Sequence, residues 1–337
     1  MEEKVKLKDI AEKLNISVAT VSNALAGKKG VSAKMRETIV EKAEELGYTH
    51  PKAENNSATT ERIGVLVANR YLDGNGTSFY WAMYQQVAYA LSKKDNVCIV
   101  ETIDREDDKL CKMPKLVQDK DITGLIIIGR LSYGLVEKIL SKAHVPVILV
   151  DYYDDRYKCD AVMSNNYLGM YFMTKYLVEK GHRGVAFVGT VEASENILDR
   201  YFGYRKCIEE FDIVFRDEWL IEDRDIETHE LKIDLPSHMP TAFVCSSDIV
   251  AGVLYDELQE KGYKVPEDIS IVGYDNYLYG HSFFDEITTY DVDMRKMAKV
   301  TVDILLKKIK NGNDDFAIRF VDGEMVERKS VKDMETP

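Results

Sequence analysis

Apolar residues recur at helical spacing in two short segments at the start of the chain. The first set is Leu7, Ile10, Ala11 and Leu14, and the second is Val18, Val21 and Leu25. Asn15 and Ser17 lie between the sets and interrupt the helical pattern. Two short amphipathic helices joined in this way predict a helix-turn-helix, whose second helix can lie in the major groove of DNA.

Further along, short apolar runs alternate with segments of helical spacing. Nine candidate strands lie at 63–68, 97–102, 124–129, 146–151, 161–164, 185–189, 241–246, 269–275 and 287–292, and segments such as 79–93, 167–180 and 249–261 show helical spacing. This alternation predicts parallel sheets covered by helices on both faces. A single sheet of nine strands is possible, but two lobes explain better why two strands come close together at 160–166.

Several motifs resemble those of the LacI/GalR family of bacterial transcription regulators. The headpiece motifs are Asp9-Ile10-Ala11, the run 17–22 (SVATVS) and the run 44–48 (EELGY), and the core motif with the highest specificity is 265–275 (VPEDISIVGYD). The resemblance covers nearly the whole chain. It implies an all-α helix-turn-helix headpiece and a two-lobed α/β core like that of periplasmic binding proteins.

The resemblance also implies a division into domains. We expect a headpiece at 1–49, a linker at 50–62, and an effector-binding and dimerisation core at 63–337. One lobe would hold approximately 63–162 and 292–318, and the other 163–291, with crossovers near 162–166, 290–293 and 318–324. Two segments depart from the family pattern: 226–240 is short, and the linker is atypical.

Family members commonly carry a hinge helix in the linker, with a large apolar side chain that wedges into the minor groove. Residues 52–61 contain no apolar side chain larger than alanine, which cannot unstack a base step. Either the hinge helix forms without a wedge, or the linker stays flexible and bends the operator less. We favour the flexible linker.

The net charge of −13 belongs to the core and not to the headpiece. Residues 1–62 hold 11 Lys and Arg against 10 Asp and Glu, whereas residues 63–337 hold 34 against 48. A nearly neutral headpiece attracts phosphates weakly. We therefore expect a homodimer that binds double-stranded operator DNA with both headpieces. Once one headpiece is bound, the other is held at a high effective concentration near the DNA, which raises the overall affinity.

Composition narrows the class of protein further. The five cysteines include no Cys-x-x-Cys pair, which disfavours a disulfide framework or a metal site. The chain starts with charged residues and has no apolar run of about 18 residues, so we expect neither a signal peptide nor a membrane partner. These features favour a cytoplasmic, nucleoid-associated bacterial protein.

The resemblance implies which headpiece residues contact DNA. Val18, Ala19 and Asn23 would read bases, and the hydroxyl side chains, which are those of Ser17, Thr20 and Ser22, would hold phosphates. The family most often carries arginine at the position of Asn23. Because asparagine favours adenine whereas arginine favours guanine, the operator should differ from the usual one. Val18 could instead be a core residue.

Candidate effector contacts lie at the carboxyl ends of predicted strands, where ligands bind in open α/β sheets. Asp151 and Asp275 end strands, and Ser247 and Asp248 follow one. The resemblance implies that Arg200 and Asp275 contact the effector, and that Ser247 replaces a more usual asparagine. The further candidates are the aromatic residues Phe79, Tyr80 and Tyr152, which could support a ring. Asp248 could instead only cap a helix, Asp151 could be a turn residue, and the aromatic residues could belong to the core.

These features predict an allosteric repressor of carbohydrate-utilisation genes, controlled by a small sugar between the lobes. The alternatives are a nucleobase-responsive corepressor-type regulator and a non-enzymatic sugar-binding protein. An enzyme is disfavoured, because His182 has no Ser or Cys elbow near it and no glycine-rich phosphate loop is present. We therefore expect no catalytic residue and no cofactor.

Overall fold

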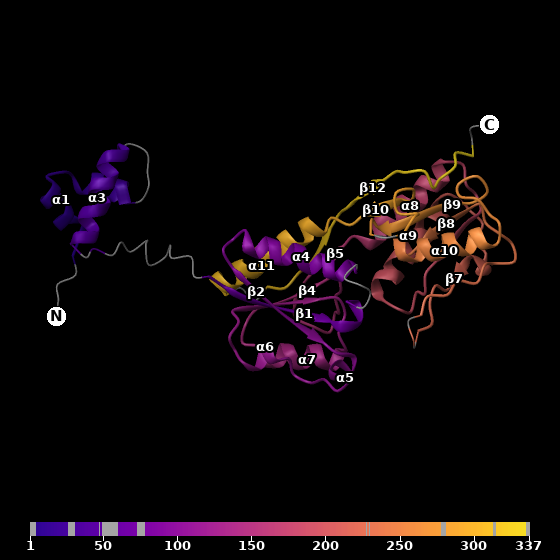
Figure 1. Ribbon diagram of the computed structural model, residues 1–337, viewed down its shortest axis with the longest axis horizontal. Helices are drawn as coiled ribbons and strands as arrows, with labels where there is room; N and C mark the ends of the chain where they lie inside the picture. The colour runs from indigo at the N-terminus through magenta and orange to yellow at the C-terminus, as the bar shows by residue number, and fades with distance from the viewer. Residues whose placement is uncertain are drawn as a thin grey trace. The chain divides into compact units, whose positions relative to one another are not determined.

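The computed structural model describes residues 5–25, 31–46, 48, 60–72, 78–226, 228, 230–277, 281–312 and 315–334. The chain forms two compact units, Met1–Thr60 and Glu61–Pro337 (Figure 1). Of the expected linker at 50–62, only the last three residues belong to the described part, so the hinge-helix alternatives lie outside the described residues.

The first unit contains three helices, α1 (Leu7–Leu14), α2 (Val18–Leu25) and α3 (Ala33–Glu45). Asn15 ends α1 in the left-handed conformation with φ 53°, which asparagine tolerates, and Ile16 N donates to Ala11 O at 3.0 Å. Ser17 Oγ then accepts from Thr20 N at 3.0 Å and caps the start of α2. The buried core contains Ile10, Ala11, Val21, Ala24, Ile39 and Ala43. These contacts produce the predicted helix-turn-helix.

The second unit contains two lobes. The sheet of lobe 1 has the order β11-β5-β4-β3-β1-β2, and all its strands are parallel. Its strands are β1 (Arg62–Ala68), β2 (Val97–Ile103), β3 (Gly124–Ile128), β4 (Val147–Val150), β5 (Asp160–Ser164) and β11 (Ile318–Val321). Its helices are α4 (Phe79–Ser92), α5 (Arg105–Lys109), α6 (Lys115–Gln118), α7 (Tyr133–Lys142) and α11 (Met294–Asn311). Helices α4 and α11 pack on one face of the sheet, and α6 and α7 pack on the other (Figure 1).

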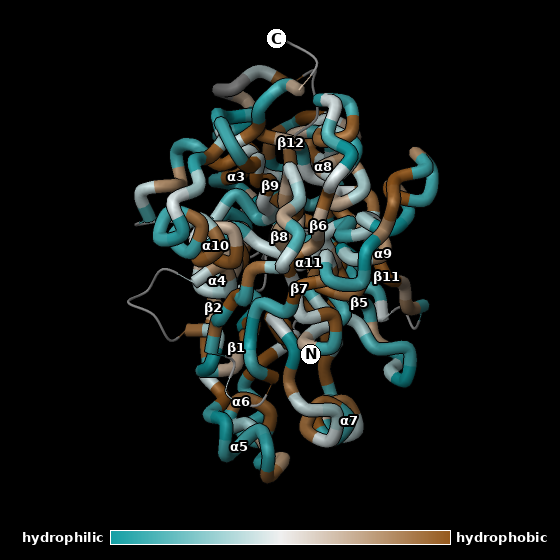
Figure 2. The backbone as a smooth tube through the Cα atoms, turned by 90° about the vertical axis from the view of Figure 1, so that its right-hand side faces the viewer, coloured by the Kyte–Doolittle hydropathy of each residue, from teal (hydrophilic) through white to brown (hydrophobic). Residues whose placement is uncertain are grey.

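Lobe 2 repeats this architecture with the sheet order β12-β10-β9-β8-β6-β7, in which only β12 is antiparallel to its neighbour. Its strands are β6 (Val185–Val188), β7 (Leu220–Ile221), β8 (Ala242–Cys245), β9 (Ser270–Asp275), β10 (Thr288–Asp291) and β12 (Glu324–Val326). Its helices are α8 (Asn166–Glu179), α9 (Glu195–Glu210) and α10 (Asp248–Glu260). Short 3-10 turns occur at Asn69–Tyr71 and Asp217–Trp219. Apolar strands and polar loops can be followed along the trace in Figure 2.

The chain passes between the lobes three times, after β5, after β10 and after β11. Asn165 Nδ2 in the first crossover donates to Asp322 Oδ1 in the third at 2.8 Å. A Cβ on Gly323 would lie 1.9 Å from the Asp291 carbonyl oxygen in the second crossover, so only glycine fits there. The three crossovers therefore pack tightly against one another.

Two further features of this unit bear on the sequence predictions. Between β7 and β8 the described residues form no helix; Arg224 pairs with Leu231 in an isolated bridge. The segment expected to be trimmed therefore lacks the family's usual helix in its described part. In the described ranges of the chain, we find no helix with the length and apolar character that a bilayer crossing requires.

Candidate functional site

Three predicted residues meet where the carboxyl ends of the two parallel sheets face each other. Asp151 directly follows β4 of lobe 1, and Asp275 ends β9 of lobe 2. Their φ angles are 62° and 101°, in the left-handed region that residues with a side chain rarely adopt. Such strain is typical of functional sites. Arg200 reaches the same place from α9 and is 6% exposed.

Arg200 uses every nitrogen of its guanidinium group. Its Nη2 donates to Asp275 Oδ1 at 3.1 Å, its Nη1 to Ser246 O at 2.6 Å, and its Nε to Asn166 Oδ1 at 2.8 Å. The guanidinium carbon lies 3.9 Å from the ring centre of Tyr274. Arg200 is therefore held in one orientation, whereas Asp275 Oδ2 has no hydrogen-bond partner among the described residues.

Asp151 joins the two lobes. Tyr80 in lobe 1 donates its hydroxyl proton to Asp151 Oδ2 at 2.9 Å. Asn196 in lobe 2 donates its amide to the same oxygen at 3.0 Å and to the Asp151 carbonyl oxygen at 2.9 Å. Asp151 Oδ1 is buried and has no partner in the part of the chain that the structure describes. It is therefore a buried acceptor that the described side chains leave unsatisfied.

Burial governs the acid–base behaviour of these carboxyls. Removal from water raises the pKa of Asp151 to about 7, although the nearby positive charge of Arg200 opposes the change. Burial likewise raises the pKa of Asp275 to about 6, and the Arg200 ion pair again opposes it. Both side chains can therefore change charge near neutral pH.

Asp248 supports the site and does not face into it. Ser247 caps α10 by accepting from Val250 N at 3.3 Å, so the expected alternative of an Asp248 cap is wrong. Asp248 instead accepts from Thr289 Oγ1 at 2.7 Å and from Tyr277 N at 2.8 Å. Burial raises its pKa to about 8. These bonds tie α10 to the segment that follows Asp275.

The predicted aromatic residues separate into two groups. Tyr80 is half-buried and contacts Asp151. The ring centre of Phe79 lies 5.4 Å from that of Tyr80 and 6.2 Å from that of Tyr277 in lobe 2. Tyr152 lies elsewhere, in the apolar core of lobe 1 beside Cys159. Strand β4 ends at Val150 and the chain bends at Asp151 with φ 62°, so the next side chain, that of Tyr152, enters the core and does not join Asp151 in the site.

Sequence reasoning missed two amides and one ion pair. Asn166 Nδ2 donates to Asn196 Oδ1 at 3.1 Å, and Asn166 Oδ1 accepts from Arg200. Asn166 therefore connects Arg200 to Asn196, the residue that contacts Asp151 of the other lobe. Arg130 of lobe 1 also pairs with Glu195 of lobe 2 at 2.9 Å. An asparagine near a helix start is typical of a cap, so the local sequence contains no signal that marks Asn166 and Asn196 as site residues.

In the first unit, the predicted DNA contacts lie together on α2 and the turn before it. Val18 is 44% exposed, which excludes a core role, and Ala19 is also exposed. Asn23 is half-buried. The predicted phosphate contacts Ser17 and Thr20 share a hydrogen bond of 2.8 Å between their hydroxyl groups, and Ser22 is half-buried.

Two family models match the chain. Residues 6–51 match bacterial regulatory proteins of the lacI family, and residues 174–331 match a periplasmic binding protein-like domain.

Among similar proteins, the HTH-type transcriptional repressor PurR of Aliivibrio salmonicida is 28% identical, covering 96% of this chain and 98% of that protein. The ribose operon repressor of Haemophilus influenzae is 27% identical with the same coverage of 96% and 98%. A solved structure of the Lac repressor dimer bound to operator and the anti-inducer ONPF matches with a TM-score of 0.65 and 22% identity, covering 98% of this chain and 100% of that one.

Proposed function

Because the chain belongs to the lacI family of bacterial regulatory proteins, a family of transcription regulators and not of enzymes, we propose that it is a repressor that a small sugar releases from its operator. The proposed domain roles are DNA binding for 1–49, connection for 50–62, and effector binding and dimerisation for 63–337. Such a repressor would act on the nucleoid in the bacterial cytoplasm.

The pair of unpartnered carboxylate oxygens supports a polyhydroxylated effector. Asp151 Oδ1 belongs to lobe 1 and Asp275 Oδ2 to lobe 2, and neither has a partner among the described residues. A sugar hydroxyl can donate to each oxygen, while Tyr80 and Arg200 hold the two carboxylates in place. One ligand would thereby bind both lobes at once.

Such binding would shift the population of lobe arrangements. A ligand that binds one arrangement more tightly favours it by the difference in binding free energy. Because the three crossovers pack against one another, we expect the lobes to move by rotation about the crossover segments. That rotation would alter how a dimer presents its two headpieces, and operator affinity would fall by reciprocal coupling.

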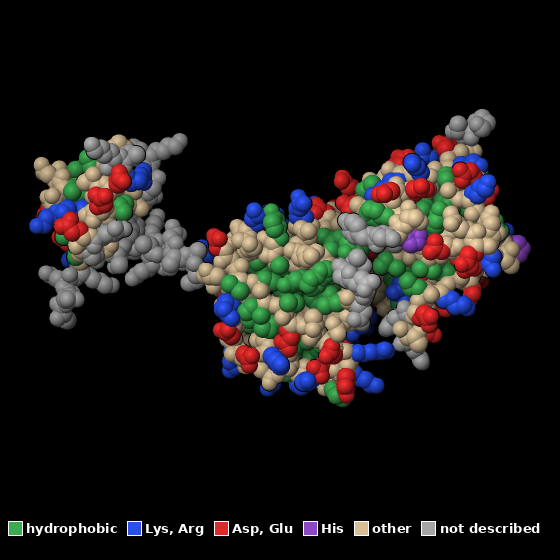
Figure 3. Space-filling view, in the orientation of Figure 1, with side chains coloured by type: hydrophobic (Ala, Val, Ile, Leu, Met, Phe, Trp, Pro, Cys, Tyr) green, Lys and Arg blue, Asp and Glu red, His purple; other side chains and the backbone are tan. Residues whose placement is uncertain are grey.

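A surface of lobe 1 supports the homodimer. Apolar side chains gather on this lobe in the view of Figure 3. Three large apolar residues of α4 and β2 are well exposed: Tyr89 at 55%, Val97 at 40% and Val100 at 38%. Contiguous exposed apolar surface marks an interface between proteins. The Lac repressor is a dimer in the operator complex that this chain resembles in fold.

The experiment is fluorescence anisotropy of the full-length protein on labelled DNA from upstream of its own gene, at fixed salt. Ribose, other pentoses, hexoses and purine bases are titrated separately. We expect one sugar to weaken operator binding, and Asp275→Asn to abolish that response while basal binding remains. The matched control is Asp212→Asn, which removes an exposed carboxylate in the turn after α9. A response to purines alone, or to no compound, would overturn the sugar proposal.

A further inference from the structure

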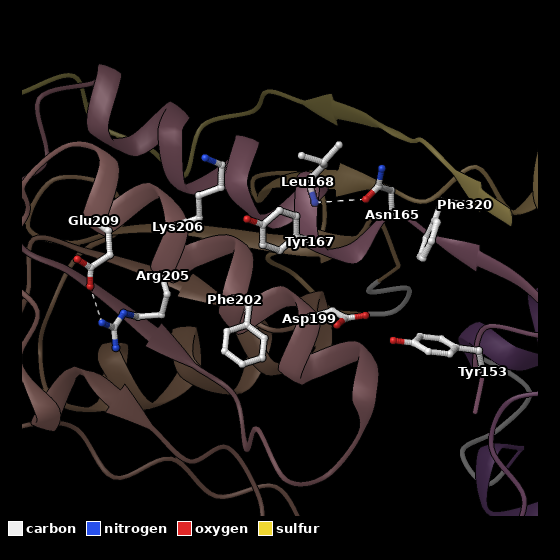
Figure 4. Close-up of a pocket in the computed structure, with 10 residues that line it drawn as sticks. All are labelled: Tyr153, Asn165, Tyr167, Leu168, Asp199, Phe202, Arg205, Lys206, Glu209 and Phe320. Atoms are coloured by element: carbon white, nitrogen blue, oxygen red, sulfur yellow. Dashed lines mark hydrogen bonds and ion pairs between the residues drawn. The ribbon is translucent and has the colours of Figure 1, made fainter. Parts of the chain in front are cut away.

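A second concave surface lies outside the effector site. It is a groove of about 760 Å³, within the size range of small-molecule sites. Tyr153 of lobe 1, Asn165 of the first crossover, Phe320 of β11 and residues of α8 and α9 line it (Figure 4). The groove therefore touches both lobes and their connection, although the effector site does not use it.

Aromatic rings surround one carboxylate in this groove. Figure 4 shows the Tyr153 hydroxyl pointing toward Asp199, with the rings of Phe202 and Phe320 on either side. Phe202 is 51% exposed and Phe320 is 54% exposed, so both rings present apolar surface to the groove. Tyr167 adds a further ring from the start of α8.

Among the charged residues that line this groove, Asp199 is the one without an ion pair in the described part of the chain. Within the described residues it has no hydrogen bond and no ion pair. The other charged residues that line the groove or adjoin it are paired: Arg130 with Glu195 at 2.9 Å, Arg205 with Glu209 at 2.7 Å, and Lys206 with Glu210 at 2.9 Å. Burial, and then the charge of Glu195, raises the pKa of Asp199, whereas the positive charge of Arg200 opposes this change. A cation in the groove would stabilise the ionised form of Asp199 further.

We propose that the groove binds a small organic ammonium ion with an apolar body, whose positive charge lies against Asp199 and between the surrounding rings. Aromatic faces attract cations, and a carboxylate among several rings is the arrangement that recognises alkylated ammonium groups. The positive charges of Arg205 and Lys206 lie six and seven residues further along α9, roughly 10 Å away at 1.5 Å per residue. Because the walls come from both lobes, occupancy would also favour one lobe arrangement.

The test is isothermal titration calorimetry of the full-length protein with benzyltrimethylammonium chloride, and with benzyl alcohol as the neutral ring control. We expect millimolar or tighter binding of the ammonium ion and much weaker binding of the alcohol. Asp199→Asn should weaken ammonium binding roughly tenfold, the effect of losing one close charge partner. Phe202→Ala should weaken it several-fold, and Asp212→Asn, outside the groove, should leave it unchanged.

Three results would overturn the proposal: no binding of the ammonium ion at millimolar concentration, equal binding of benzyl alcohol, or unchanged binding in both Asp199→Asn and Phe202→Ala. Operator binding by each variant without ligand, measured in parallel, reports whether the variant is folded. Because none of these variants replaces a proposed effector contact, failure here leaves the repressor proposal standing.

Discussion

Replacing Asp151 by asparagine tests whether the burial of the Asp151 carboxyl makes the stability of the protein depend on pH. The ordinary pKa of 3.8 applies in the unfolded chain, whereas the folded value is about 7. Folding therefore favours the protonated form. The stability that this preference contributes is complete below about pH 4 and is lost as the pH rises through about 7. Asparagine keeps an acceptor for Tyr80 and has no charge to lose.

The magnitude follows from the two pKa values. Relative to low pH, the titration of Asp151 lowers the free energy of unfolding by roughly 4 kcal/mol at about pH 8.5 and by roughly 2 kcal/mol at about pH 5.5, at 1.36 kcal/mol per pKa unit. At the lower pH the side chain is ionised only in the unfolded chain. The stability advantage of Asp151→Asn over the parent should therefore grow by about 2 kcal/mol between those two conditions.

Urea unfolding of both proteins at the two pH values measures this difference. The negative charge of Asp275 contributes to the raised pKa of Asp151, so the two carboxyls titrate as a coupled pair and the comparison reports the loss of Asp151 from that pair. Asp212→Asn, at an exposed position, serves as the control and should show no such pH dependence. A stability difference that stays constant between the two pH values would refute the assignment of Asp151 as a buried, protonating carboxyl.

Three other substitutions test separate parts of the structure. Arg200→Lys cannot form the three hydrogen bonds that the guanidinium nitrogens make. Because hydrogen bonds to charged groups contribute about 1.5–3 kcal/mol each, the effector affinity measured by calorimetry should fall at least roughly tenfold. Unchanged affinity would argue against a role of Arg200 in holding the effector site. Gly203→Ala places a Cβ 2.1 Å from the Tyr167 carbonyl oxygen and so forces α8 and α9 apart. The free energy of unfolding in urea should fall by about 3 kcal/mol. A variant as stable as the parent would contradict this packing. Asn23→Arg should change the preferred half-site base from adenine to guanine in a binding selection, and an unchanged preference would remove Asn23 from the base contacts.

The strands were predictable because parallel strands buried on both faces form continuous apolar runs. Each of the nine predicted strands occurs within one residue of its predicted bounds at either end. The missed strands are β7, β11 and β12, of two, four and three residues. Such short strands at sheet edges are partly exposed and leave no apolar run in the sequence.

From the apolar pattern alone, the candidate site was predictable at the ends of strands, whereas Arg200 followed only from the family resemblance. Asp151 and Asp275 follow apolar runs, and the structure brings both to Arg200. The contacts of Asn196 depend instead on two lobes brought together by three crossovers, which no local pattern encodes. Tyr152 does not join the site because the chain leaves the strand and bends at Asp151, a left-handed residue that the apolar pattern does not reveal.

The most direct test of the account is the reciprocity of its two binding sites. The effector dissociation constant is measured by calorimetry with and without saturating operator, and the operator dissociation constant by anisotropy with and without saturating effector. If the effector binds between the lobes and controls the headpieces, the two ratios must be equal and both above one. A sugar that binds at Asp151 and Asp275 yet leaves operator affinity unchanged would contradict the account.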